Sequence, residues 1–419
     1  MTAIASNGPM SPAAARDGMI SDVKEGLDQL DVAAKSFCTS NDDVGDVVNK
    51  AQRQQIIEAA QKVLNVVKGP DDVWVDINMD IARIAACQLL YKWGAFEAIP
   101  VEGSISYQDL ADATEAEEAL LRRIGGVLVS QGYLKQTGTD DIHHTPKSLG
   151  YRSENASSHV LNMSWTNAFV PYAKMPEYFE QYGRKEPQAT THVPVSFAHG
   201  RPDLTFYELL GTDLDGAWAD SFVKGMAHVE SRMPVTAAGG GGPGGRGVNY
   251  YYDFSWLVSA VRAEPAPPDS DHTLGQQQQQ QQPQAASTRA VLVDVGGGLG
   301  GAIRAIHREF PGLPICRFVL EDRPETLEAG GRDGSDDELA GVQRVAVDFH
   351  RDQPVKGAYT YWMRRCFHNY SDEVSRNMLR IIVDAMAEDS RLLIQEDVLD
   401  NPPHQWAAFL DFMMLGLGG

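Results

Sequence analysis

The chain has 419 residues, 43% of them hydrophobic, so it is long enough to build a sizeable core in each of two or three domains. It carries 36 Lys+Arg against 57 Asp+Glu, a formal net charge of −21. Because such a charge repels phosphate backbones and anionic membrane surfaces, nucleic acid and membranes are not expected as partners.

The cysteine pattern and the N-terminus indicate the compartment. The four cysteines, Cys38, Cys87, Cys316 and Cys366, are scattered and form no CxxC pair, which favours a reducing compartment. The N-terminus lacks the apolar core of a signal peptide, and no apolar run reaches the roughly 18 residues of a membrane helix. The sequence therefore predicts a soluble, cytoplasmic protein.

The chain opens with a polar segment and two helices. Residues 1–18 are rich in Ala, Ser, Gly and Pro and are predicted to be disordered. Apolar residues at helical spacing predict amphipathic helices over Ile20–Cys38 and Asn49–Lys68. No core lies beside them in sequence, so they are expected to pack on another domain or on a second subunit.

Three helices and a small hairpin follow, an order that is typical of a winged helix. The predicted elements are helices Asp80–Trp93, Tyr107–Ala113 and Glu117–Gln131 and strands Gly132–Gln136 and Asp141–Thr145. Winged helices commonly bind DNA through the third helix, but this one balances Glu117 and Glu118 with Arg122 and Arg123. A DNA-binding helix needs a basic face, so DNA binding is disfavoured for this domain, residues 19–150.

Residues 151–235 are predicted to be helical, with bulky apolar and aromatic residues over Ser158–Met175 and Leu204–Met233. Such residues could be plain core or could line a pocket. Residues 236–289 change character, because a glycine run, a proline patch and the glutamines Gln276–Gln282 cannot bury enough apolar surface to become ordered. They are predicted to be surface insertions around an island, Tyr250–Leu257, that packs at the domain junction. A partner-binding role of the glutamines is a less favoured alternative.

A nucleoside-binding unit opens the last domain, residues 290–419. Val291–Val295 reads as a buried parallel strand, the glycines to Gly301 as a tight turn, and Ala302–Phe310 as a helix. Glycine leaves the backbone N–H groups at the helix start open to a ligand. A second strand, Arg317–Asp322, ends in a carboxylate where ribose hydroxyls are bound in such units. Glycines 296, 298 and 301 also fit dinucleotide spacing, so NAD stays open here.

Three more strands extend the pattern, so an α/β fold with a mostly parallel sheet is predicted. They are Gln343–Val347, Ala358–Met363 and Arg391–Ile394, each with polar residues at its carboxyl end. The ligand crevice of an open parallel sheet lies outside those ends. The residues collected there are Asp294, Gly296, Gly298, Asp322, Asp348, Arg364, His368 and Glu396.

These motifs resemble a known family. Asp294 followed by Gly-Gly-Gly-Leu-Gly resembles motif I of S-adenosylmethionine-dependent methyltransferases, and more closely that of the plant caffeic-acid and fungal sterigmatocystin type of O-methyltransferase. Tyr361–Glu373 resembles the most specific motif of that family, and residues 82–134 resemble its N-terminal dimerisation domain. The resemblance spans about residues 76–419 and implies a Rossmann-like sheet, S-adenosylmethionine as cofactor and a homodimer.

The resemblance also assigns roles. It makes His368 the catalytic base and Glu396 the carboxylate beside it. The cofactor positions that it implies are Asp294, Gly296, Gly298, Asp322, Asp348, Phe349 and Arg364, the last replacing a common lysine. Phe222 and Met226 match the segment that lines the acceptor pocket, and no metal is expected.

The implied reaction is in-line methyl transfer to a hydroxyl of a small aromatic, polyketide-like secondary metabolite. Family members continue past Gly419 into a second carboxylate and two closing strands, so a C-terminal truncation is predicted, with Arg391–Ile394 as an exposed sheet edge. An inactive relative with a binding or regulatory role is the main alternative. An NAD-dependent oxidoreductase is another, although it should lack the His368 loop and the helical N-terminal domain.

Overall fold

The computed structural model describes residues 12–39, 46–212, 216–231, 252–264, 289–330, 338–396, 398–399, 401–403 and 405–418. The chain divides into two compact units, which meet in sequence between Thr145 and Pro146. The predicted pocket segment, 151–235, and the predicted methyltransferase domain, 290–419, therefore belong to one unit. The glycine-rich and glutamine-rich parts of the predicted insertions lie outside the described residues, as do residues 1–11 of the predicted disordered N-terminus.

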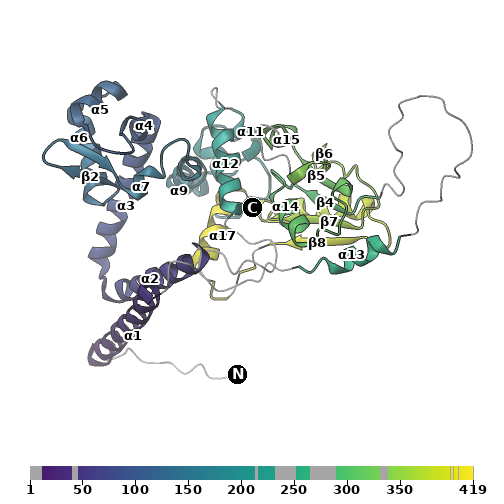
Figure 1. Ribbon diagram of the computed structural model, residues 1–419, viewed down its shortest axis with the longest axis horizontal. Helices are drawn as coiled ribbons and strands as arrows, with labels where there is room; N and C mark the ends of the chain where they lie inside the picture. The colour runs from purple at the N-terminus through teal and green to yellow at the C-terminus, as the bar shows by residue number, and fades with distance from the viewer. Residues whose placement is uncertain are drawn as a thin grey trace, which may run out of the picture. The chain divides into compact units, whose positions relative to one another are not determined.

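The first unit is mainly helical (Figure 1). Its helices are α1 (Pro12–Thr39), α2 (Asp46–Val67), α3 (Pro70–Lys92), α4 (Ala95–Ala98), α5 (Tyr107–Thr114) and α6 (Glu118–Ser130). Its strands are β1 (Ile105–Ser106), β2 (Leu134–Thr137) and β3 (Asp141–His144), in the antiparallel order β1-β3-β2. The N-terminal helical domain is thus confirmed, with α1 and α3 starting earlier than the periodicity predicted and with β1 as an additional short strand.

Helices α1 and α2 pack closely together. Lys62 Nζ of α2 lies 2.8 Å from Glu25 Oε1 of α1. Gly26 faces Val63 so closely that a Cβ atom on it would lie 2.7 Å from Val63 Cγ2. A glycine at this point therefore lets the two backbones approach.

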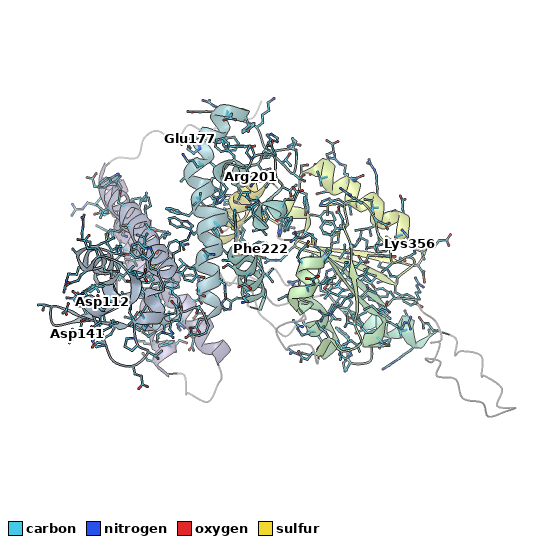
Figure 2. All side chains as sticks on the ribbon, turned by 90° about the horizontal axis from the view of Figure 1, so that it is seen from above. Asp112, Asp141, Glu177, Arg201, Phe222 and Lys356 are labelled. Carbon is cyan, nitrogen blue, oxygen red and sulfur yellow. The ribbon has the colours of Figure 1, made fainter. Side chains whose placement is uncertain are left out.

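The second unit begins with helices that precede its sheet. They are α7 (Pro146–Leu149), α8 (Ala156–Ser164), the π-helix η1 (Trp165–Phe169), α9 (Val170–Tyr182), α10 (Pro194–Ala198), α11 (Phe206–Leu210), α12 (Ala217–Ser231) and α13 (Ser255–Arg262). The predicted helix Leu204–Met233 is thus two helices, α11 and α12. Phe222, labelled in Figure 2, lies among these helices on α12.

The sheet of the second unit has five parallel strands in the order β6-β5-β4-β7-β8. Its strands are β4 (Leu292–Val295), β5 (Phe318–Asp322), β6 (Gln343–Ala346), β7 (Thr360–Arg364) and β8 (Arg391–Gln395). Helices between and after them are α14 (Gly301–Glu309), the 3-10 turn η2 (Ile315–Arg317), α15 (Pro324–Gly330), the 3-10 turn η4 (Phe367–Asn369), α16 (Asp372–Ala385) and α17 (Gln405–Leu417). The predicted α/β class with a parallel sheet is confirmed, and among the described residues β8 is an edge strand.

Alternate residues of β4, β5 and β7 enter two separate cores. One core joins Leu292, Leu320 and Trp362 to α13 and α14. The other joins Val293, Val319, Tyr361 and Met363 to α16. The sheet is therefore covered on both faces, as strands with apolar residues on both faces require.

The island of the insertion segment packs differently from the prediction. Phe254 and Leu257, at and within α13, are fully buried in the core of the second unit. The Phe254 ring lies 5.6 Å from Trp362 of β7 and 5.9 Å from Phe310, between ring centroids. The predicted position at a domain junction was wrong, because these aromatic residues complete one face of the sheet. No helix among the described residues is long and apolar enough to cross a membrane.

Candidate active site

The glycine turn after β4 has the geometry that the sequence predicts. Gly296, Gly298 and Gly300 have φ values of 72°, 60° and 74°, a region that side chains disfavour. The N–H groups of Gly296 and Gly297 donate to the Glu321 carbonyl of β5 at 2.8 and 3.0 Å. Nothing lies within 4 Å of the position that a Cβ of Gly298 would occupy. The turn is therefore anchored to β5 and open on its Gly298 side.

Asp294, in β4, packs against this turn. It is only 1% exposed, and its Oδ2 atom lies 2.5 Å from the position of a Cβ on Gly297. A side chain at Gly297 would displace this carboxylate, so the glycine lets the turn fold over it. Asp294 thus differs from the other predicted cofactor residues, because it lies under the turn and offers almost no surface to a ligand.

Asp322 joins the glycine turn to the end of β5. Its Oδ2 accepts from the Gly298 N–H at 2.8 Å, and its Oδ1 accepts from the Arg323 N–H at 2.8 Å. Each oxygen keeps a second lone pair, so the carboxylate could also accept from two neighbouring hydroxyls of a ribose. The structure brings Asp322 and the glycine turn together as predicted.

Asp348 and Phe349 follow β6 at the same edge of the sheet. Asp348 is exposed, accepts from the His350 N–H at 3.1 Å and pairs with Arg351 Nε at 3.2 Å. The Phe349 ring lies beside the glycine turn, with Cε1 3.4 Å from the position of a Cβ on Gly296. These two residues therefore border the turn on the β6 side.

His368 and Glu396 form the polar pair expected of a catalytic base and its carboxylate. His368 lies in η4 after β7, and Glu396 directly follows β8, the neighbouring strand. Glu396 Oε2 lies 2.8 Å from His368 Nδ1. Glu396 Oε1 accepts from the N–H groups of Cys366 and Phe367 at 2.8 and 2.7 Å. One carboxylate thus fixes both the ring and the backbone of the loop that carries it.

The other ring nitrogen of His368, Nε2, differs from Nδ1 in its surroundings. The side chain is 31% exposed, and within the described part of the chain Nε2 has no hydrogen-bond partner. An imidazole held through Nδ1 in this way can accept a proton at Nε2. Arg364, at the end of β7, pairs in register with Gln395 of β8 and so belongs to the same edge.

Two details of this loop were not predicted. Cys366 is buried against the glycine turn, with its Sγ 2.9 Å from the position of a Cβ on Gly296, and burial raises the pKa of this thiol well above its usual value. Ser371 occupies the N-cap position of α16, yet it makes no capping bond, and its hydroxyl donates to the Gln188 carbonyl at 3.2 Å.

The acceptor side is built from α11 and α12. The Phe222 ring lies 5.2 Å from Phe206 and 6.3 Å from Tyr207, and Met226 follows one helical turn later on α12. Tyr207 lies in a segment that the sequence leaves open as core or as pocket lining, and its ring centroid lies 4.4 Å from the guanidinium carbon of Arg323, the residue that directly follows β5. No local sequence signal separates it from Phe206, because the contact depends on the fold. Among the described residues no group of three or more His, Cys, Asp or Glu could hold a metal ion.

Comparison with known proteins supports the fold and the chemistry. The family model for an O-methyltransferase domain matches residues 276–417. Methyltransferase cfoD of Aspergillus candidus is 33% identical over 372 residues, which cover 87% of this chain and 83% of cfoD. Methyltransferase pvhD of Talaromyces variabilis is 32% identical over 343 residues, which cover 81% of this chain and 83% of pvhD.

Two solved structures share the fold. OxaC, in complex with SAH and oxaline, superposes with a TM-score of 0.73 at 21% identity, covering 96% of this chain and 90% of OxaC. The mitomycin 7-O-methyltransferase MmcR superposes with a TM-score of 0.59 at 22% identity, covering 88% of both chains. The Rossmann-like sheet and the helical N-terminal region are therefore shared with these two proteins.

Proposed function

The chain belongs to the family of S-adenosylmethionine-dependent O-methyltransferases, and on that premise we propose that it methylates a hydroxyl of a small aromatic secondary metabolite. Membership overturns the alternative of an NAD-dependent oxidoreductase, because this family uses S-adenosylmethionine. The observation that carries the finer proposal is the contact of His368 Nδ1 with Glu396 Oε2 at 2.8 Å.

In this proposal His368 accepts the proton of the acceptor hydroxyl at Nε2. Glu396 keeps the ring in one orientation and stabilises the positive charge that the ring gains. A positioned base of this kind typically contributes about 10²- to 10⁴-fold to the rate. The rest of the acceleration comes from holding the hydroxyl oxygen in line with the methyl group that is transferred.

The residues around the glycine turn fit the cofactor. S-adenosylmethionine supplies, when bound, a methyl group on a positively charged sulfur. We infer that Gly296 and Gly298 leave room for it, that Asp322 binds its ribose, and that Asp348, Phe349 and Arg364 complete the site. Asp294 supports the turn rather than contacting the cofactor directly.

We infer the class of acceptor and the oligomeric state from two sets of apolar residues, one on α12 and one on α1, α2 and α3. Phe222 and Met226 lie on the helix that packs on Tyr207, so we infer that an aromatic acceptor lies against α12. The exposed apolar residues of α1, α2 and α3 favour a homodimer formed through the first unit. The four cysteines are free, which fits the reducing cytoplasm.

Substitution of the proposed base tests the mechanism. His368→Ala should retain S-adenosylhomocysteine binding in calorimetric titrations and lose at least about 10²-fold of methyl transfer to a panel of phenols, measured by mass spectrometry with isotope-labelled cofactor. His307→Ala, in the last turn of α14, is the matched control. Unchanged transfer by His368→Ala would remove the residue from the mechanism, whereas wild-type binding without any transfer would favour a non-catalytic role.

A further inference from the structure

Cys366 is a buried cysteine that the proposed reaction does not use. It directly precedes η4, the turn that carries His368, and is 7% exposed. Its Sγ lies against Gly296, because a Cβ atom on that glycine would be only 2.9 Å from it. Carbonyl oxygens of Arg364, Val295 and Gly296 lie 3.5, 3.6 and 4.0 Å from the same sulfur, within reach of a thiol donor. The thiol therefore contacts both the end of β4 and the first residue of the glycine turn.

The backbone of the same residue is tied to the proposed base. The N–H groups of Cys366 and Phe367 donate to Glu396 Oε1 at 2.8 and 2.7 Å. The second oxygen of Glu396, Oε2, lies 2.8 Å from His368 Nδ1. Strand β7 lies between β4 and β8 in the sheet. The loop after β7 is thus held from both neighbouring strands, by the Cys366 thiol on the β4 side and by the Glu396 carboxylate on the β8 side.

The residue before Cys366 turns the chain sharply. Arg365 has a φ of 56°, a region that residues with a side chain rarely adopt, and its N–H donates to the Gln395 carbonyl at 2.9 Å. Such a conformation persists only where the surrounding contacts hold it. Burial also raises the pKa of the Cys366 thiol well above its usual value, so the thiol keeps its proton and remains a donor to the carbonyls around it. The loop is therefore held in one arrangement, with the thiol filling the space beside Gly296.

We propose that Cys366 is a positioning residue that sets the distance between the glycine turn and the imidazole of His368. This inference rests on the proposed function, because it needs S-adenosylmethionine at the glycine turn and the acceptor hydroxyl at His368. In-line transfer depends on the alignment of the two reactants, and a misplacement of about 1 Å can lower the rate about 10²-fold. Because the Cys366 side chain lies between the glycine turn and the loop of the base, a smaller side chain there lets the loop move relative to the turn.

The substitution Cys366→Ala removes the sulfur and keeps the backbone N–H that donates to Glu396. Methyl transfer to the phenol that the wild type methylates fastest should fall about tenfold, while the Kd for S-adenosylhomocysteine stays within about twofold of the wild-type value. Cys87→Ala is the matched control, because Cys87 is also buried, at 2% exposure, but lies on α3 of the first unit. It should lower the melting temperature and leave both the rate and the Kd unchanged. If Cys366 served packing alone, the two variants would behave alike.

Hydrogen exchange tests the same link without an acceptor. The N–H groups of Cys366 and Phe367 should exchange more slowly when S-adenosylhomocysteine binds the wild type, and this slowing should be lost in Cys366→Ala and kept in Cys87→Ala. A wild type that does not bind S-adenosylhomocysteine would contradict the proposed function itself. A wild type that binds it, together with a Cys366→Ala variant that keeps both the wild-type rate and the slowing, would overturn only the role of Cys366. Should Cys366→Ala not fold, Cys366→Ser decides, with a rate lowered about threefold expected and an unchanged rate counting against the proposal.

Discussion

Glu321 is a buried carboxylate that the proposed reaction does not use. It is 0% exposed on β5, and its Oε2 accepts from Gln353 Nε2 at 2.7 Å, whereas Oε1 has no hydrogen-bond partner among the described residues. Burial raises the pKa of Glu321 to about 7. The folded state therefore holds this proton more tightly than the unfolded chain does, so the residue contributes stability below its ordinary pKa that is lost as the pH rises to about 7.

The substitution Glu321→Gln should remove this pH dependence. Compared with the wild type, the variant should gain up to about 3 kcal/mol in unfolding free energy between pH 5 and pH 8, because a neutral amide has no charge to bury. Urea titrations at both pH values measure the difference. Glu309→Gln, at an exposed position of α14, should show no such gain. Equal pH profiles for Glu321→Gln and the wild type would mean that Glu321 is ionised in the folded protein.

Gly297 is the residue of the turn with the least room. A Cβ atom there would lie 2.5 Å from both Asp294 Oδ2 and Leu320 Cδ1. Gly297→Ala should therefore cost about 2 kcal/mol of stability and weaken S-adenosylhomocysteine binding, since the turn must shift. Gly126→Ala, in α6 with nothing near its Cβ position, should be neutral or slightly stabilising. Thermal unfolding and calorimetric titration of both variants check this, and wild-type values for Gly297→Ala would show that the turn yields at no cost.

At the scale of elements, the strands could be predicted because their signal is local. β4, β5 and β7 are mostly apolar, and each begins within two residues of its predicted start. The helices before the sheet could not be placed as well. Between α8 and α9 the chain forms the π-helix η1, where the Val170 N–H donates to the Trp165 carbonyl and Pro171 has no N–H to continue an α-helix.

The candidate site, too, could be predicted only in part. The glycine turn, Asp322, His368 and Glu396 lie at strand ends, so topology alone brings them to one edge of the sheet. Tyr207 and Arg323 were missed because their contact joins α11 to the end of β5, and no spacing rule relates these two elements. Asp294 was predicted from its motif, but only coordinates show that it lies beneath the turn.

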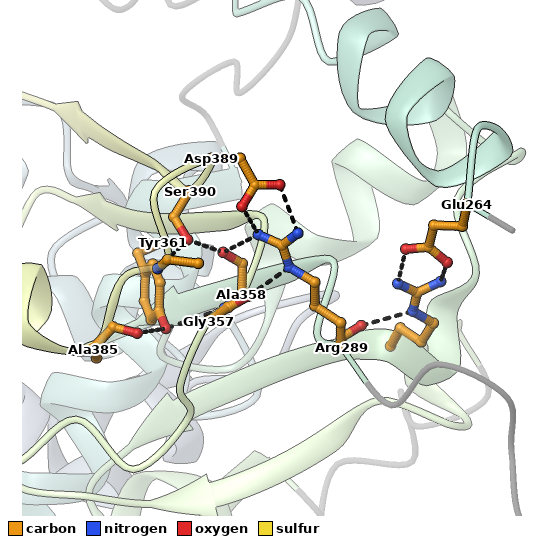
Figure 3. A network of polar contacts seen from close by, with 10 residues as sticks. Glu264, Arg289, Gly357, Ala358, Tyr361, Ala385, Asp389 and Ser390 are labelled. Atoms are coloured by element: carbon orange, nitrogen blue, oxygen red, sulfur yellow. Dashed lines mark hydrogen bonds and ion pairs between the residues drawn. The ribbon is translucent and has the colours of Figure 1, made fainter.

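Arginines connect the amino-terminal ends of the strands, opposite the carboxyl ends where the proposed site lies (Figure 3). Arg317, just before β5, forms two hydrogen bonds to Glu264 at 2.6 and 2.8 Å and a third to the Arg289 carbonyl. Arg289, just before β4, forms two more to Asp389 at 2.7 Å. Through Arg317 the network joins Glu264 and Arg289, which are far apart in the sequence.

This network and the proposed site lie at different ends of the strands. A substitution in the network should therefore lower the stability of the protein without changing its affinity for S-adenosylhomocysteine. Arg317→Met leaves Glu264, 15% exposed, without its partner and should cost about 3 kcal/mol, whereas the Kd for S-adenosylhomocysteine should stay unchanged. Arg308→Met breaks the exposed pair with Glu338 and should cost less than about 1 kcal/mol. Urea unfolding and ligand titration measure both. A weakened Kd for Arg317→Met would show that the two ends of the strands are coupled.

At the scale of the whole molecule, large apolar side chains are exposed on α1, α2 and α3 of the first unit, and contiguous exposed apolar patches mark interaction surfaces. The first half of α3 is one part of this surface, since no residue of this helix before Ala86 is buried and Trp74 is 66% exposed. Helices α1 and α2 add Leu27, Val32 and Ile57. The proposed homodimer would bury these side chains against a second copy of the same surface, as two-fold association requires.

Charging this surface should therefore dissociate the protein. The wild type should elute with a mass of about twice 45.8 kDa in light scattering, and the double substitution Trp74→Asp with Ile77→Asp should shift it to the monomer mass, because two carboxylates cannot be buried without partners. Val101→Asp, an exposed apolar position outside these helices, should stay dimeric. A monomeric wild type at micromolar concentration would contradict the proposed dimer, and the exposed surface of α3 would then bind a different partner. A double variant that remains dimeric would instead place the interface away from the first half of α3.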